Sequence, residues 1–218
     1  MLYYDPTFLL LIPCLILSLW ASFRVQSVFK KYSEVPVSSG MTGAQVAAQI
    51  LNRAGLGTAG SDGAGLRVVS GGGFLGDYYD PTRKMLNLSP EVYGQATLSA
   101  VGVAAHEAGH ALQDAEGYFP LRIRSLILPA ANIGSMGAPF LFMLGFFFRT
   151  PMMMDVAIVL FTAAVLFYLV TLPVEFDASR RAVQVLSGEG FINRVETQAV
   201  RQVLGAAAMT YVAAAFMA

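Results

Sequence analysis

Long apolar stretches without charged residues limit this chain to very few folds. Hydrophobic residues occupy 56% of its 218 positions and charged residues only 13%. Four windows approach the roughly 20 apolar residues that a transmembrane helix needs. They run from Pro6 to Phe23, from Ser125 to Phe148, from Val156 to Val174 and from Gln202 to Ala218. The sequence therefore predicts a mainly α integral membrane protein with three to four transmembrane helices.

The windows differ in how they are expected to cross the bilayer. The first follows Met-Leu-Tyr-Tyr-Asp and ends at Trp-Ala-Ser-Phe-Arg, whereas a cleaved signal peptide has a basic start and a small-residue exit, so we expect an uncleaved anchor. The second window is followed by Arg149-Thr150-Pro151, which is too short to form anything but a turn. The second and third windows are therefore predicted to form a transmembrane hairpin. The last window is barely long enough to span, which leaves the count at three or four.

Basic residues predict the orientation. With the N-terminus outside, segments 24–124 and 175–201 lie in the cytosol and hold all but Arg149 of the 14 Lys and Arg residues. This distribution follows the positive-inside rule. We therefore expect an integral protein of a bacterial plasma membrane whose soluble parts face the cytoplasm. The formal net charge is zero, which gives no indication of a nucleic-acid partner.

Both histidines of the chain stand in His106-Glu107-Ala108-Gly109-His110, inside a helix-prone run from Thr97 to Ala115. Residues four apart lie on one face of a helix, so both imidazoles can reach a single Zn²⁺. Glu107 lies beside them, within reach of a water on the metal, as a general base would. The alternative is a pair of core histidines, but a helix so rich in Ala and Gly has little other reason to carry this pattern.

A hydrolytic zinc site usually takes three protein ligands and leaves one position for water. The only cysteine, Cys14, lies in the first anchor, so the third ligand is expected to be a carboxylate. Asp114 and Glu116 lie too far along the same helix as the histidines. Glu175, just after the third window, is the predicted ligand, and Asp177 is the alternative.

The segment that carries Glu175 is expected to return to the membrane face of the zinc helix. Pro173 is predicted to open a helix there, with Glu175 near its positive N-terminal end. Solvated charge beside Arg180 and Arg181 is the alternative role for both carboxylates.

The long soluble segment has its own predicted elements. Thr42 and Gln45 form a capping box at a helix start, and Gly55 ends that helix. Residues 55–60 match G-x-G-x-x-G, but they follow a helix and run into more glycine, so we expect a flexible connection and no dinucleotide site.

Short strands are predicted at 66–69 and 85–89, with a turn at Asp80-Pro81 between them. The second strand could offer an edge to a substrate backbone, and an ordinary hairpin packed on the zinc helix is the alternative.

Four segments together closely resemble the YugP-type membrane zinc metallopeptidases. They are residues 77–81 (DYYDP), 86–93 (LNLSPEVY), 102–113 (GVAAHEAGHALQ) and 174–182 (VEFDASRRA). The likeness runs from the first anchor to the end of the chain. More distantly, the layout is similar to HtpX and the CAAX prenyl proteases, gluzincins whose third ligand is a Glu on a helix after a transmembrane hairpin.

The resemblance implies one zinc ion per chain, with His106, His110 and Glu175 as ligands and Glu107 as the base. Two positions depart from the related patterns. Ser179 stands where the distant relatives have Asp, so either Asp177 or Ser179 is expected to orient a histidine. Tyr78 stands where the YugP-type pattern has His.

Peptide-bond hydrolysis is the reaction that this site predicts. A second donor must share the developing oxyanion with zinc, and the unranked candidates are Tyr78, Tyr79, Arg180 and Arg181. The expected parts are an anchor at 1–23, a zincin-like domain at 24–124 with the HExxH helix and a small β-sheet, a transmembrane hairpin at 125–174, a ligand-bearing helix at 175–201 and a last transmembrane helix at 202–218.

Two other functions stay open. A site-2-type intramembrane protease would suit the apolar zinc helix, but its usual Leu-Asp-Gly motif does not occur here. A zinc-containing membrane scaffold or chaperone is the non-enzymatic alternative, although structural zinc sites usually have four ligands and are rich in Cys. The expected partners are the lipid bilayer and a peptide or protein substrate, with an oligomer or a regulatory membrane partner left open.

Overall fold

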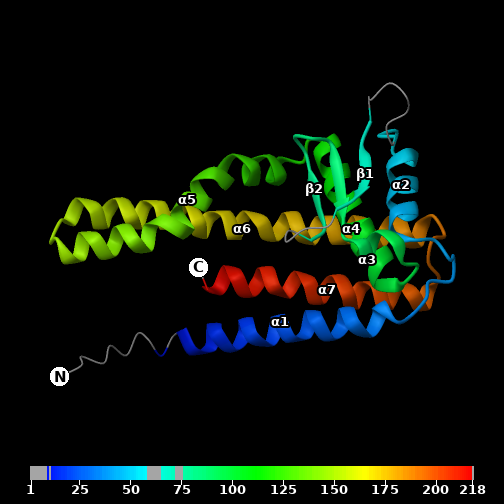
Figure 1. Cartoon of the computed structure of the whole chain (residues 1–218), viewed down its shortest axis with the longest axis horizontal. Helices are drawn as coiled ribbons and strands as arrows, with labels where there is room; N and C mark the ends of the chain where they lie inside the picture. Colours follow the sequence, from blue (N-terminus) through cyan, green and yellow to red (C-terminus); the bar gives the residue numbers. More distant parts are fainter. Residues whose placement is uncertain (1–8, 10, 58–64, 72–75, 218) are drawn as a thin grey trace.

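The computed structural model describes residue 9 and residues 11–57, 65–71 and 76–217. In this part of the chain long helices lie side by side, and a small sheet covers one end of the bundle (Figure 1). The helices are α1 (Leu11–Ser33), α2 (Gly43–Arg53), α3 (Pro90–Gly94), α4 (Leu98–Ala115), α5 (Phe119–Phe147), α6 (Pro151–Gly188) and α7 (Arg194–Met217). The predicted fold class is confirmed. Positions 58–60 of the G-x-G-x-x-G match lie outside the described residues.

Among the described residues, four helices are long and apolar enough to cross a membrane: α1, α5, α6 and α7. Helices α5 and α6 pack along each other and are joined by a short turn, in which Arg149 adopts a left-handed φ of 54°. Helices α5 and α6 therefore form a helical hairpin, and its crossing of a membrane stays a prediction. The α5–α6 turn forms one end of the bundle, the start of α1 and the end of α7 point the same way but stop short of it, and the sheet, α2 and α3 lie toward the other end (Figure 1).

The end of α6 differs from the prediction. This helix runs without a break from Pro151 to Gly188, so the helix expected to begin at Pro173 does not exist as a separate element. A proline inside a helix removes one backbone hydrogen bond, but apolar bundle helices tolerate it where neighbouring groups compensate. Glu175 therefore lies in the middle of a helix, where the partial positive charge of a helix N-terminus does not act on it.

Helix α4 lies at the centre of the fold. It packs against α2, α3, α6 and α7 as well as the sheet. Its contact with α6 is very close, because a Cβ on Gly109 would lie 2.8 Å from the carbonyl oxygen of Ala178. Glycine is therefore required there to bring the two helices together. At the start of α2, the capping box between Thr42 and Gln45 is present as predicted.

Three strands form the sheet: β1 (Arg67–Ser70), β2 (Tyr78–Asp80) and β3 (Met85–Leu88). Their order is β1-β3-β2, with β1 parallel and β2 antiparallel to β3. Both predicted strands are present as β1 and β3, and an unpredicted strand, β2, lies just before the turn and forms an antiparallel hairpin with β3 that packs on α4. Because β3 is the central strand, it offers no free edge to a substrate. The edge strand that packs on α4 is β2.

Candidate metal centre

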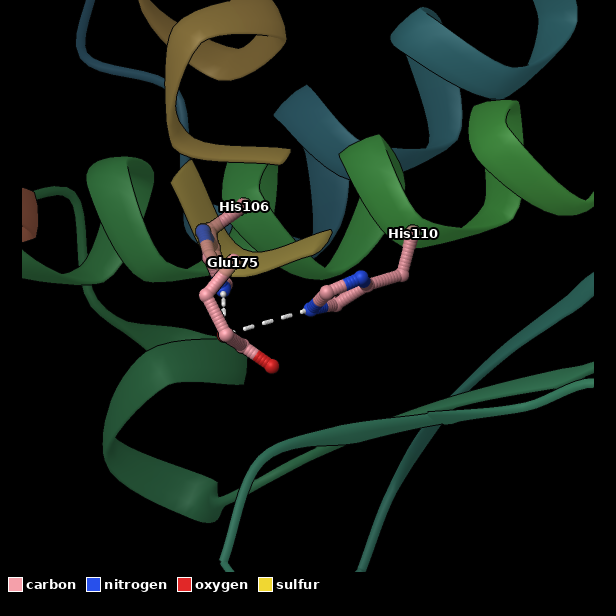
Figure 2. Close-up of side chains that lie close together, drawn as sticks. All are labelled: His106, His110 and Glu175. Atoms are coloured by element: carbon pink, nitrogen blue, oxygen red, sulfur yellow. Dashed lines mark hydrogen bonds and ion pairs between the residues drawn. The ribbon is translucent and has the colours of Figure 1, made fainter. Parts of the chain in front are cut away.

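The predicted ligands meet where α4 crosses α6. His106 and His110 project from one face of α4, and Glu175 reaches them from α6 (Figure 2). Its Oε2 lies 3.2 Å from Nε2 of His106 and 3.6 Å from Nε2 of His110. One ligand atom from each residue can be chosen so that all three lie within 4.8 Å of one another. The alternative ligand, Asp177, is not part of this group.

Gln113, one turn after His110, holds that imidazole in place. The side chain of Gln113 is fully buried, and its Nε2 donates to the carbonyl of Val174 and to Oδ2 of Asp177, both at 2.9 Å. Its Oε1 therefore faces Nδ1 of His110 at 3.0 Å and can only accept a proton from it. This hydrogen bond leaves the lone pair of His110 Nε2 free on the side of Glu175.

His106 is held in a similar way. The hydroxyl of Ser179 lies 3.1 Å from Nδ1 of His106, and Nε2 of the same ring is the atom near Glu175. Ser179 thus contacts a histidine directly, whereas Asp177 reaches His110 through Gln113. Gln113 was not predicted. Its signal in the sequence is its position three residues after His110, on the same side of the helix.

Both candidate arginines bind carboxylates away from the histidines. Arg181 donates from Nε to Asp177 at 2.6 Å and pairs with Glu116 at 2.7 Å. Arg180 also donates to Asp177. The two arginines therefore anchor the carboxylate that holds Gln113.

A cavity of about 210 Å³ adjoins two of the three donors, His110 and Glu175. Besides His110 and Glu175, its lining includes Glu107, Asp77, Tyr78, Tyr79, Arg124 and Tyr211. Neither Arg180 nor Arg181 belongs to this lining. Arg124 and Tyr211 were not predicted as site residues. Arg124 directly precedes an apolar window and Tyr211 lies inside another, and neither position carries a motif that indicates a site.

The two tyrosines of β2 differ in their bonding. The hydroxyl of Tyr79 donates to Oδ2 of Asp114 at 2.7 Å, and Lys84 pairs with the same oxygen at 2.6 Å. Burial, together with this hydrogen bond to a carboxylate, raises the pKa of Tyr79 well above its ordinary value. Tyr78 lines the cavity, and no hydrogen bond of its hydroxyl is found among the described residues.

Charges around His110 favour its protonated form. Burial alone would lower the pKa of His110, but the nearby carboxylates of Glu175 and Glu107 outweigh it and raise that pKa. A proton on Nε2 occupies the place that a bound cation would take. The carboxylates of Glu107 and Glu175 therefore favour positive charge at this position, whether it is a proton on Nε2 or a bound cation.

The donor set fits zinc. Two imidazole nitrogens and one carboxylate oxygen are ligands that Zn²⁺ accepts in hydrolytic sites. The second nitrogen of each imidazole already lies at hydrogen-bond distance from a neighbouring side chain. Glu175 is buried, with only 2% of its surface exposed, and its one cationic partner outside the histidines is Arg124, at 3.7 Å, within the described part of the chain.

Comparisons with known proteins agree with this geometry. The family described as "Putative neutral zinc metallopeptidase" matches residues 7–218. A curated relative, "Putative membrane protease YugP" of Bacillus subtilis (strain 168), is 48% identical over 208 residues, which cover 95% of this chain and 89% of that protein. No solved structure matches the chain significantly. Four membrane-length helices, the buried His-His-Glu group and the match over nearly the whole length lead to one conclusion: the chain belongs to this family of membrane zinc metallopeptidases.

Proposed function

We propose that the protein is a zinc metalloendopeptidase that hydrolyses peptide bonds of a protein or peptide substrate, with its active site facing the cytoplasm. One zinc ion per chain would be held by His106, His110 and Glu175. The observation that carries the proposal is that these three donors lie within 4.8 Å of one another, and that His110 and Glu175 line a cavity which Glu107 also lines. A substrate and a water molecule can therefore meet the metal from the cavity.

Zinc at this position would polarise the scissile carbonyl and make water acidic enough to act near neutral pH. Glu107 supplies the proton transfer. Its residue surface is only 8% exposed, and it forms no hydrogen bond or ion pair with any described residue. Its carboxylate is thus free to take a proton from the attacking water and later deliver it to the leaving nitrogen.

The position of α4 supports an interfacial enzyme over a site-2-type protease. The helix that carries both histidines is enclosed by protein elements, and it is not among the helices with the length and hydropathy of a membrane span. A structural zinc site is less well supported, because such sites usually have four protein ligands and no cavity beside the metal.

Zinc content and peptidase activity of the detergent-purified protein test the proposal. The wild type should hold about one zinc per chain and cleave an unstructured peptide. Glu107→Gln should retain zinc and lose activity by about 10²- to 10⁴-fold, since only the proton acceptor is removed. The matched control Glu91→Gln, on the exposed surface of α3, should match the wild type.

Ligand variants complete this experiment. Glu175→Ala should lose zinc and activity together, whereas Asp177→Ala should retain much more zinc, because it removes a support and not a ligand. Wild-type turnover by Glu107→Gln would contradict the enzymatic role and favour the scaffold. Full zinc content in Glu175→Ala would contradict the ligand set.

A further inference from the structure

Arg124 is the cation that faces the metal centre from outside the ligand set. Its Nη1 lies 3.7 Å from Oε1 of Glu175, while Oε2 of the same carboxylate lies between the two histidines. The two oxygens of Glu175 therefore face different groups. Arg124 is placed by the first turns of α5 and lines the same cavity as Glu107.

The guanidinium of Arg124 is partly enclosed, and its ion pair with Glu175 is not a hydrogen bond. Only 29% of the side chain is exposed, and the guanidinium carbon lies 5.9 Å from the ring centre of Phe167. The distance of 3.7 Å to Glu175 is too long for a hydrogen bond. Among the described residues no hydrogen bond of Arg124 is found, so its N–H groups are available to an oxygen anion that forms in the cavity.

Tyr211 adds a neutral donor from another helix, α7. It lines the same cavity as Glu107, Glu175 and Arg124. The cavity is therefore lined by a base, two metal-binding side chains, a guanidinium that is ion-paired with Glu175, and a phenol. The other cations considered for this role, Arg180 and Arg181, are bound to Asp177 outside the cavity.

We propose that Arg124 is a catalytic residue that stabilises the oxyanion formed during hydrolysis, with Tyr211 as its accompanying donor. The inference rests on the proposed peptidase function and identifies the second donor that must share the oxyanion with zinc. As the water oxygen bonds to the carbonyl carbon, its proton passes to Glu107 and the π electron pair moves onto the carbonyl oxygen. Arg124 donates to that oxygen. The electron pair on the oxyanion then reforms the carbonyl. As the C–N bond breaks, its electron pair leaves with the nitrogen, which takes the proton from Glu107.

A preorganised cationic donor acts mainly on the transition state, so its loss should lower kcat more than it raises KM. Arg124→Gln should therefore reduce kcat by about 10²- to 10³-fold, with KM changed only a few-fold and the zinc content unchanged. Arg124→Lys keeps the charge but loses the planar fork, and we expect an intermediate loss. Tyr211→Phe should reduce kcat by about tenfold.

Arg122→Gln is the matched control, because Arg122 lies on the same helix but outside the cavity lining. It should retain the wild-type kcat. Binding of a phosphinic peptide, which mimics the tetrahedral transition state, gives a second readout: Arg124→Gln should weaken it in proportion to kcat while leaving substrate affinity nearly unchanged.

Three results would overturn the inference: Arg124→Gln with kcat within threefold of the wild type, Arg124→Gln that loses activity only in proportion to its zinc, or a kcat effect shared equally by Arg122→Gln. These results are distinct from failure of the proposed function, in which the zinc-loaded wild type itself would cleave no peptide.

Discussion

At the residue scale, the ligand spacing is local and could be predicted, and Ser179 was one of two candidates for orienting a histidine, whereas the role of Gln113 was not predicted. His106 and His110 are four apart, so helix geometry alone places them on one face. Glu175 could be inferred from the shortage of other ligands. Gln113 gains its role only because Val174 and Asp177 of another helix accept its two amide hydrogens. The spacing places Gln113 on the same side of the helix as His110, but the partners that fix its amide come from tertiary packing.

The first prediction concerns this amide. Gln113→Met should weaken zinc affinity by about 10- to 100-fold, because His110 loses the acceptor that fixes its Nδ1 proton. The carbonyl of Val174 also loses its side-chain donor, which should lower stability. Chelator competition with the purified protein measures the zinc affinity. Gln184→Met, at an exposed position of α6, is the control, and equal affinities in the two variants would show that Gln113 does not support the metal.

At the element scale, the hairpin, the capped α2 and the zinc helix could all be predicted, because each depends on signals within a short stretch of sequence. The continuity of α6 through Pro173 could not. Proline usually marks a boundary, and only the packed neighbours of α6 make an interior proline tolerable. The closeness of α4 and α6 was equally hidden, since it depends on Gly109 meeting the backbone at Ala178.

This close contact gives the second prediction. In an isolated helix Gly→Ala stabilises by roughly 1 kcal/mol, but the Cβ of Gly109→Ala would approach the carbonyl oxygen of Ala178 to 2.8 Å. The two helices must then separate, which we expect to cost about 1–3 kcal/mol and to lower the apparent Tm by several degrees. Zinc affinity should fall as well, because the histidines and Glu175 lie on the separating helices.

Gly205→Ala serves as the control for this prediction. Gly205 lies inside α7, and nothing lies within 4 Å of the position that its Cβ would take. This variant should keep its zinc and match or exceed the wild-type Tm. If Gly109→Ala behaved like Gly205→Ala in both thermal melting and zinc titration, the close helix contact would not determine the geometry of the metal centre.

At the scale of the whole molecule, the sheet could not be predicted in full. The parallel pairing of β1 with β3 places Arg67 opposite Met85, which is 18 positions later in the sequence. Strand β2 lies between β1 and β3 in the sequence. Nothing in either strand specifies that pairing, because it depends on how all three strands pack on α4 and on neighbouring helices. The orientation of the bundle in the membrane is also a property of the whole chain.

Charge distribution gives the last prediction. The α5–α6 turn lies at the end of the bundle opposite the sheet (Figure 1), and Arg149 in that turn is the only basic residue expected outside the cell. In a Cys14→Ala background, a membrane-impermeant maleimide should label Arg149→Cys in intact cells. It should label Arg83→Cys, whose native side chain is 72% exposed beside the sheet, only after lysis.

The two cysteine positions control for each other, since both are exposed and each should react fully once the cells are broken. Labelling of Arg83→Cys in intact cells, with Arg149→Cys protected, would invert the bundle. The metal centre lies on the sheet side of the apolar part of α6, so an inverted bundle would place hydrolysis outside the cytoplasm. The substrates would then be exported or surface proteins, while the chemistry assigned to Glu107 and Arg124 would stand unchanged.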